Sequence, residues 1–253
     1  MTDQLYVQRD QPPGVPPLHL TGERTLPDVP EENYWYRRHL VVYEWIAQRV
    51  HGRKVVDLAC GEGYGSAVLA RTAASVVGVD ANPEAFEHAR AKYKQARFER
   101  NMIELWQGEV DCVVFLQTIE HIQDPDAMLS HIRDLIEPGG VAYVSTPNVL
   151  TLAPKGAERS GNPWHVREYK PAEYRELCER HFDNVDLLGL FHARKLRAHQ
   201  VAIEHLGWDR VHKGLRFTKP FYDRFTPAIS ARDFTLKRSD LDRCLDLIAV
   251  LRA

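Results

Sequence analysis

Three residues of the sequence carry side chains suited to acid–base chemistry. Glu120 and His121 are adjacent and follow an apolar run at 111–117, and His165 lies in a long loop at 146–170 that is rich in proline and glycine. A neutral imidazole, with an unperturbed pKa of about 6.5, can take a proton from a hydroxyl group near neutral pH. Glu120 and His121 can equally serve to cap and orient their loop, and among the 12 histidines of the chain any single one is more often structural than catalytic.

A glycine-rich stretch at 54–66 predicts a ligand-binding corner. Its apolar first half is typical of a buried strand, and the glycines then turn the chain into a helix. In open α/β sheets, ligands lie beyond the carboxyl ends of the strands, where glycines allow close approach. The spacing of Gly61, Gly63 and Gly65 departs from the dinucleotide pattern G-x-G-x-x-G, and the carboxylate of Asp57 disfavours a pyrophosphate. The corner therefore suits a ligand that carries positive charge.

Alternating strands and helices around this corner predict an α/β fold. We expect a Rossmann-like, seven-stranded, mostly parallel sheet with helices on both faces. Residues 1–30 hold six prolines and predict an extended arm, 31–253 form the main domain, and 193–229 predict a helical insertion before the last strand. The expected strands are 54–59, 75–79, 97–100, 111–117, 141–145, 184–190 and 247–251, and the main expected helices are 31–50, 64–72, 83–93, 125–137 and 171–181.

The charge balance and the cysteines argue against several classes of function. Lys and Arg number 33 against 35 Asp and Glu, so the net charge of −2 offers no basic field to nucleic acid or an anionic membrane. The four cysteines are scattered singly, without the paired spacing of a zinc or redox site. No apolar signal core is visible, and no apolar run approaches the roughly 20 residues of a membrane span. We expect a cytoplasmic protein with no nucleic-acid partner and no membrane insertion.

The motif order resembles that of the class I S-adenosylmethionine-dependent methyltransferases. Residues 57–65 resemble the family's first motif, with Ala59 where glycine is usual, and the resemblance continues over roughly 50–190. It implies S-adenosylmethionine as the cofactor. Arg38 would pair with the cofactor's methionine carboxylate or remain a solvated helix charge. The cofactor-binding residues implied in this way are Asp57, Ala59, Gly61, Gly63, Asp80 (at the ribose), Ala81, Asn101 and Met102 (at the adenine), Gln117 and Arg38.

A narrower resemblance is carried by segments 21–24, 118–121, 145–148 and 162–169. Together they resemble methyltransferases of polysaccharide and cell-envelope gene clusters, above all those that O-methylate mycobacterial polymethylated polysaccharides. This implies methyl transfer to a sugar hydroxyl of an oligosaccharide or polysaccharide precursor. The residues implied at the acceptor are the catalytic candidates His165, His121 and Glu120 and the aromatic residues Trp164, Tyr36 and Tyr169, which could stack on a sugar ring or simply pack in the core.

The resemblance also raises the question of a metal ion. Related quinone methyltransferases can hold a divalent ion with a Glu-x-x-Glu-His motif after the fourth strand, and here Gln117 stands at the first position. Glu120 and His121 are therefore candidate ligands of Mg²⁺. Two other functions stay open: O-methylation of a small aromatic, quinone-type or other natural-product acceptor, and a catalytically silent cofactor-binding scaffold. An apolar arm and cap need partners, which leaves room for a homodimer.

Overall fold

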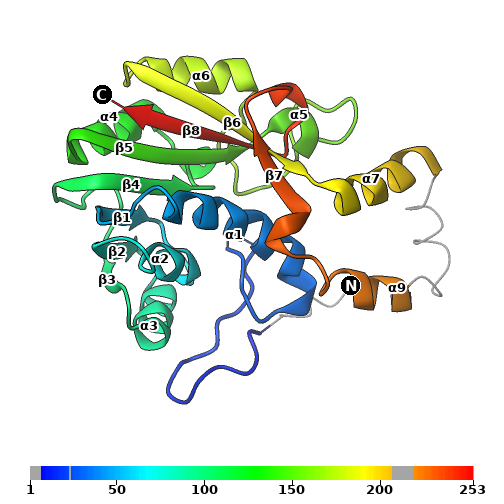
Figure 1. The fold of residues 1–253 in the computed structure, drawn as a ribbon, viewed down its shortest axis with the longest axis horizontal. Coiled ribbons are helices and arrows are strands. Elements are labelled where there is room, and N and C mark those ends of the chain that lie inside the picture. The colour runs from blue at the N-terminus through cyan, green and yellow to red at the C-terminus, as the bar shows by residue number, and fades with distance from the viewer. Residues whose placement is uncertain (1–6, 23, 207–218, 253) are drawn as a thin grey trace.

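The computed structural model describes residues 7–22, 24–206 and 219–252, and these build an eight-stranded sheet flanked by helices (Figure 1). The strand order is β3-β2-β1-β4-β5-β8-β6-β7. Strands β1 to β5 are parallel, and β8 lies antiparallel between β5 and β6. The strands are β1 Lys54–Leu58, β2 Ser75–Asp80, β3 Arg97–Arg100, β4 Val110–Leu116, β5 Ile136–Pro147, β6 Asn184–His192, β7 Phe234–Lys237 and β8 Asp246–Arg252.

The predicted α/β fold, with its mostly parallel Rossmann-like sheet, is confirmed. The structure adds one short strand to the predicted seven, because β7 pairs antiparallel with β6 at the edge of the sheet. Within the predicted insertion, α7 and α9 are helical, and residues 207–218 lie outside the described residues. The helices are α1 Asn33–Ala47, α2 Tyr64–Leu69, α3 Pro83–Lys92, α4 Pro125–Leu135, α5 Val149–Leu152, α6 Pro171–Glu179, α7 Arg194–Leu206 and α9 Lys219–Phe225.

Two hydrophobic cores lie on opposite faces of the sheet. Successive side chains of a strand point to opposite faces. In β4, Cys112 and Val114 accordingly belong to one core, whereas Val113 and Phe115 belong to the other. Apolar side chains of α1 and α2 cover the first core, and those of α4 and α6 cover the second. The sheet is therefore held between two helical layers, and its carboxyl edge is left for the loops.

The glycine-rich corner joins β1 to α2 through left-handed backbone conformations. Ala59, Gly61 and Gly63 have φ values of 57°, 56° and 95°. Such values suit glycine, whereas the side chain of Ala59 makes its conformation strained. A Cβ atom on Gly63 would lie 2.7 Å from the Cβ atom of Ala89 in α3, so close packing also requires glycine there.

The proline-rich arm lies against this corner. The amide of Gln8 donates hydrogen bonds to Glu62 Oε1 at 2.9 Å and to the Pro27 carbonyl at 3.0 Å. Within the arm, Leu18 packs against Leu26 and Val29 in a small apolar cluster. Residues 1–6 and Glu23 of the predicted arm lie outside the described residues. The described part of the arm is thus tied to the loop that carries the glycines.

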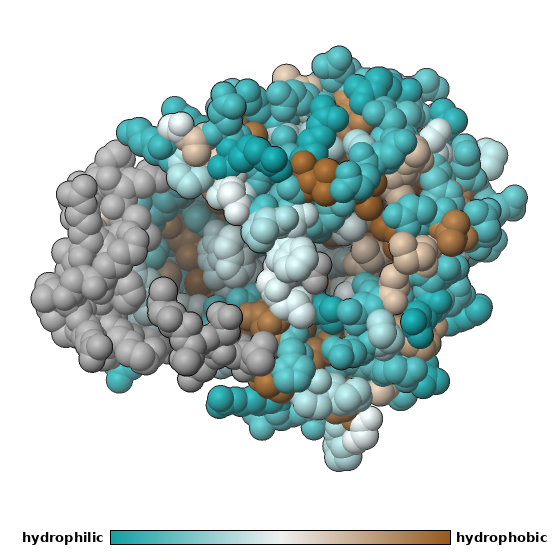
Figure 2. Space-filling model, turned by 180° about the vertical axis from the view of Figure 1, so that it is seen from behind, coloured by the Kyte–Doolittle hydropathy of each residue, from teal (hydrophilic) through white to brown (hydrophobic). Residues whose placement is uncertain are grey.

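On the face seen in Figure 2, the described residues form no broad apolar patch. Hydrophilic residues predominate there, apolar residues are scattered in small groups, and the surface is hollowed in the left half of the view. Scattered apolar residues are ordinary for a globular protein and do not by themselves mark a binding site. Among the described residues, no helix is both long and apolar enough to cross a membrane.

Candidate active site

Two adjoining cavities open at the carboxyl edge of the sheet. The first, of about 510 Å³, lies over the glycine-rich corner, and the second, of about 270 Å³, lies between α1 and the loops after β4 and β5. Volumes in this range suit a cofactor and a small acceptor. The wall between them consists of residues that line both cavities: Arg24, Thr25, His39, Gln117 and His121. This arrangement lets two ligands meet at a shared boundary.

The first cavity contains the predicted ribose-binding carboxylate. Asp80 ends β2, where its Oδ2 accepts a hydrogen bond from the Gly61 amide at 2.8 Å and its Oδ1 accepts one from the Asn82 amide at 2.8 Å. A Cβ atom on Gly61 would meet nothing within 4 Å, so the loop presents open space to a ligand. Of the predicted cofactor residues, those that line this cavity are Ala59, Gly61, Asp80, Ala81 and Gln117.

Besides Arg38, four predicted cofactor residues do not line the first cavity. Asp57 is fully buried below the loop, where it accepts hydrogen bonds from Ser66 Oγ at 2.7 Å and Tyr43 Oη at 3.2 Å. Burial raises the pKa of Asp57 to about 7. Gly63 serves the turn into α2, and Asn101 and Met102 follow β3 outside both cavities. Direct ligand contact by Asp57 is therefore contradicted, and its carboxylate instead ties the loop to α1 and α2.

The prediction for Arg38 is also corrected. This side chain in α1 is 4% exposed, and it donates from Nε and Nη2 to the two carboxylate oxygens of Asp246 at 2.7 and 2.5 Å. Nη2 also donates to the Leu245 carbonyl at 2.9 Å. A buried charge requires such a partner. Arg38 lines only the second cavity, so it is neither a solvated charge nor placed for the cofactor's carboxylate.

Glu120 presents an unsatisfied carboxyl oxygen beside the second cavity. The residue is 1% exposed, it lines this cavity, and its Oε2 has no hydrogen-bond partner among the described residues. Burial raises the pKa of Glu120 to about 8, because the charged form is poorly solvated there. A buried polar atom without a partner is costly, and a polar ligand in the cavity would satisfy it.

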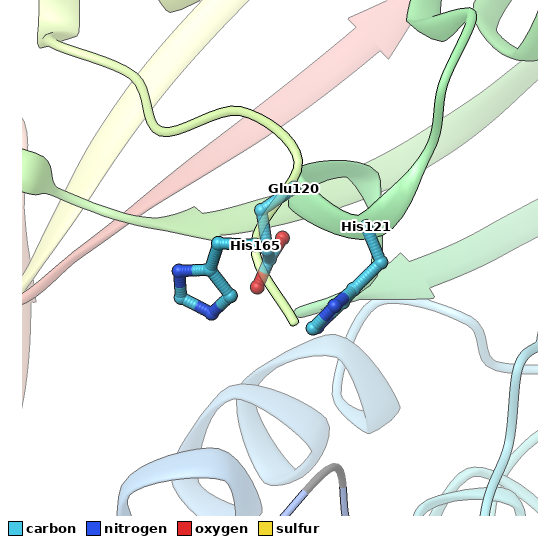
Figure 3. Close-up of side chains that lie close together, drawn as sticks. All are labelled: Glu120, His121 and His165. Atoms are coloured by element: carbon cyan, nitrogen blue, oxygen red, sulfur yellow. The ribbon is translucent and has the colours of Figure 1, made fainter. Parts of the chain in front are cut away.

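His121 lies at the boundary between the two cavities. Its Nδ1 lies 2.8 Å from the Trp164 carbonyl, which can only accept, so Nδ1 carries a proton. Figure 3 shows the Glu120 carboxyl group close to the rings of His121 and His165. The two rings pack edge to face, with 5.1 Å between centroids. Of the predicted bases, His121 alone lines both cavities.

Hydrogen bonds engage both ring nitrogens of His165, which was predicted as a catalytic base. Its Nδ1 donates to Glu168 Oε1 at 2.8 Å, and its Nε2 lies 3.0 Å from the Asn162 amide nitrogen. Because the Asn162 oxygen accepts from the Trp164 amide at 3.0 Å, the Asn162 nitrogen must face His165 and donate to it. The lone pair of Nε2 therefore already accepts a hydrogen bond. Within the described structure, His165 therefore has no free ring nitrogen to accept a proton.

The donor set does not fit Mg²⁺. Glu120, His121 and His165 can bring one ligand atom each to within 4.8 Å of one another. This set has two imidazoles and one carboxylate, whereas Mg²⁺ prefers oxygen ligands. Both ring nitrogens of His165 are already engaged by Glu168 and Asn162. We assign no step to a metal ion.

Of the three aromatic residues predicted at the acceptor, only Trp164 lines a cavity. Trp164 is 48% exposed and lines the first cavity. Tyr169 is a core residue with 1% exposure that packs against Tyr174, so its predicted role at the acceptor is contradicted. Tyr36 lines neither cavity and packs edge to face on Tyr64.

Two other residues of α1 line the cavities. Trp35, whose ring could stack on a sugar or pack in the core according to the sequence, lines the second cavity and is 40% exposed. His39 lines both cavities, and burial lowers its pKa to about 4, which keeps it neutral. The signal available in the sequence was the aromatic and basic residues around this helix, which indicate that more than one of its faces is covered.

Comparison with known proteins agrees with this geometry. Residues 34–201, more than half of the chain, match the family model described as a methyltransferase domain. The chain is 44% identical over 183 residues to a probable S-adenosylmethionine-dependent methyltransferase of Mycolicibacterium smegmatis, with 71% of each chain covered. It is 33% identical over 129 residues to a ubiquinone biosynthesis O-methyltransferase of Pseudomonas aeruginosa, covering 45% of this chain and 55% of that protein.

The fold is similar to that of a solved structure from Thermotoga maritima described as a possible histamine N-methyltransferase. The TM-score is 0.59 at 14% identity, with 88% of this chain and 95% of that chain covered. At this identity the likeness concerns the fold alone. Together with the family model and the relative from Mycolicibacterium smegmatis, it identifies the chain as a member of the class I S-adenosylmethionine-dependent methyltransferases.

Proposed function

We propose that this protein transfers a methyl group from S-adenosylmethionine to a hydroxyl group of a sugar in an oligosaccharide or polysaccharide precursor. The observation that carries the proposal is the pair of adjoining cavities with His121 in their common wall. One cavity lies over the glycine-rich corner, and the other has a carboxyl group and an aromatic side chain for a polar acceptor. A base between the two is what methylation of a hydroxyl requires.

The first cavity fits the cofactor. Asp80 is positioned for the ribose hydroxyls, and Gly61 leaves room for close approach of the ligand to the main chain. When bound, S-adenosylmethionine supplies a methyl group already activated by its sulfonium, which the acceptor oxygen takes as the carbon–sulfur bond breaks. The neutral His39 in the shared wall avoids placing a second positive charge near that sulfonium.

The residues of this chain orient the acceptor and take its proton. His121, in the wall between the two cavities, takes the proton of the acceptor hydroxyl, and the Trp164 carbonyl stabilises the ring proton at its Nδ1. The Glu120 carboxyl group, mostly protonated at neutral pH, hydrogen-bonds a polar group of the acceptor.

The second cavity favours a sugar over a flat aromatic acceptor. Glu32, Glu120 and Asn162 line it with hydrogen-bonding groups, and the exposed ring of Trp35 offers an apolar face for sugar C–H groups. A phenol or quinone precursor would satisfy fewer of these groups. That alternative is kept because of the similarity to the ubiquinone biosynthesis O-methyltransferase over 45% of the chain.

The test is mass-spectrometric detection of methyl transfer to short manno- and gluco-oligosaccharides, free and partly O-methylated. Catechol-type phenols form the competing panel, and each reaction is run with Mg²⁺ and with EDTA. We expect one methyl group on a sugar, no loss of rate with EDTA, and loss of turnover in His121→Ala with cofactor affinity retained. Methylation of phenols alone would overturn the sugar proposal, and loss of rate with EDTA would overturn the metal-free mechanism. Cofactor binding without transfer to any acceptor would favour the silent scaffold.

A further inference from the structure

We propose that Arg24 binds the carboxylate at the methionine end of the cofactor, the role that was predicted for Arg38. Arg24 belongs to the N-terminal arm, and its side chain lines both cavities. Among the described residues, it is the only lysine or arginine that lines the first cavity. The inference rests on the cofactor of the proposed function, and it does not depend on which acceptor is methylated.

The guanidinium group of Arg24 is available to a ligand. Within the part of the chain that the structure describes, it has no hydrogen bond and no ion pair. Arg38, the other arginine that lines a cavity, is already paired with both carboxylate oxygens of Asp246. A guanidinium carries five N–H donors in a planar fork, which matches the two oxygens of a carboxylate. Of the two arginines, only Arg24 can therefore offer this fork to a ligand.

The acidic residues that line the first cavity are engaged with other groups. Glu62 is 1% exposed, and its Oε1 accepts a hydrogen bond from Lys92 Nζ at 2.8 Å. Each carboxylate oxygen of Asp80 accepts from a main-chain amide of the loops that it joins. Neither carboxylate is paired with Arg24 among the described residues. The charge of Arg24 is thus left for a group that enters the cavity.

The neighbours of Arg24 hold its main chain in place without its side chain. Thr25 Oγ1 lies 3.0 Å from Tyr64 Oη at the start of α2. Leu26 is fully buried in the small apolar cluster of the arm. Because these contacts fix the segment, little order must be gained when the guanidinium meets a ligand, and such preorganisation favours binding.

The charges of the cofactor fit this arrangement. S-adenosylmethionine carries a carboxylate as well as its sulfonium. An unpaired guanidinium in the wall between the cavities would repel the sulfonium, whereas one that is paired with the carboxylate of the same ligand is neutralised. A carboxylate that leaves water for the cavity needs such a partner. His39 in the same wall cannot supply the charge, because burial lowers its pKa to about 4.

The experiment measures binding by isothermal titration calorimetry on the whole chain, without an acceptor. The ligands are S-adenosylhomocysteine and its decarboxylated analogue, which differ only in the carboxylate. Arg24→Met removes the charge, and Arg24→Lys keeps a charge but not the planar fork. Arg9→Met, at an exposed position of the same arm, is the matched control. Urea denaturation shows whether each variant is folded.

We expect Arg24→Met to weaken the binding of S-adenosylhomocysteine by about 10- to 100-fold, as loss of a charge-assisted pair does, and to leave binding of the decarboxylated analogue unchanged. The wild type should prefer S-adenosylhomocysteine over the analogue by the same factor. Arg24→Lys should fall between wild type and Arg24→Met, and Arg9→Met should match the wild type.

Two results would overturn the proposal. Unchanged binding of S-adenosylhomocysteine in Arg24→Met would show that Arg24 does not meet the carboxylate, and an equal loss for both ligands would show that it only shapes the cavity. Failure of the proposed function is distinguishable. Wild-type protein would then bind S-adenosylhomocysteine in the manner expected here and yet transfer no methyl group to a sugar.

Discussion

Replacement of Glu120 by Gln should stabilise the protein, and increasingly so as the pH rises. Burial raises the pKa of this carboxyl group to about 8, from 4.5 for an ordinary glutamate. Between these values the unfolded chain has lost the proton that the folded chain keeps. The stability linked to Glu120 is therefore fully present below pH 4.5 and is lost as the pH rises to about 8. Glutamine cannot ionise and lacks this dependence.

The magnitude follows from the same linkage. Each pH unit in this window changes the free energy of unfolding by about 1.4 kcal/mol, so the ionisable carboxyl group costs the wild type about 3 kcal/mol at pH 7. A buried amide introduces its own unsatisfied hydrogen bonds, and that cost does not vary with pH. The diagnostic quantity is therefore the slope with pH of the difference between variant and wild type, rather than its value at one pH.

Urea denaturation at several pH values between about 5 and 8.5 measures this slope. The raised pKa of Asp57 contributes equally to both proteins and cancels in the difference. Glu158→Gln, at an exposed position, serves as the control and should show no slope. A difference between Glu120→Gln and wild type that stays constant over this range would refute the assignment of a buried, protonated carboxyl group.

Three further substitutions test other features. Arg38→Met should lower the free energy of unfolding by about 3–5 kcal/mol, because it strands the buried Asp246, and pairing it with Asp246→Leu should restore much of the loss in urea denaturation; equal instability of the double variant would contradict the ion-pair account. Ala59→Gly should stabilise by about 1 kcal/mol by relieving the left-handed strain, which a lowered melting temperature would disprove. Trp35→Ala should raise the acceptor KM by about 10-fold through the lost ring face, with cofactor affinity measured by calorimetry unchanged; a parallel loss of cofactor affinity would speak for a structural role.

Local sequence patterns were sufficient for the fold and for the shape of the glycine-rich corner. The strand at Arg97–Arg100 lies where it was predicted, and the glycine spacing correctly indicated a turn from β1 into α2. These features depend on neighbours in the chain, namely apolar runs and glycines at positive φ. Asp80 followed from its place at the end of β2.

Where a predicted role was wrong, the position of the side chain is set by contacts between segments that are distant in the sequence. The partner of Arg38 is Asp246, more than two hundred positions later, and no local pattern identifies such a pair. Tyr169 follows the loop motif directly, yet it turns into the core beside Tyr174. The choice between His121 and His165 as base required the orientation of the Asn162 amide, which only the three-dimensional hydrogen bonds reveal.

The position of the N-terminal arm has a thermodynamic consequence. Arg24 and Thr25 line both cavities, and Thr25 Oγ1 lies 3.0 Å from Tyr64 Oη at the start of α2. Any displacement of this segment by one ligand therefore changes the affinity for the other. Linkage requires the effect to be reciprocal, so the factor by which the cofactor alters acceptor binding equals the factor by which the acceptor alters cofactor binding.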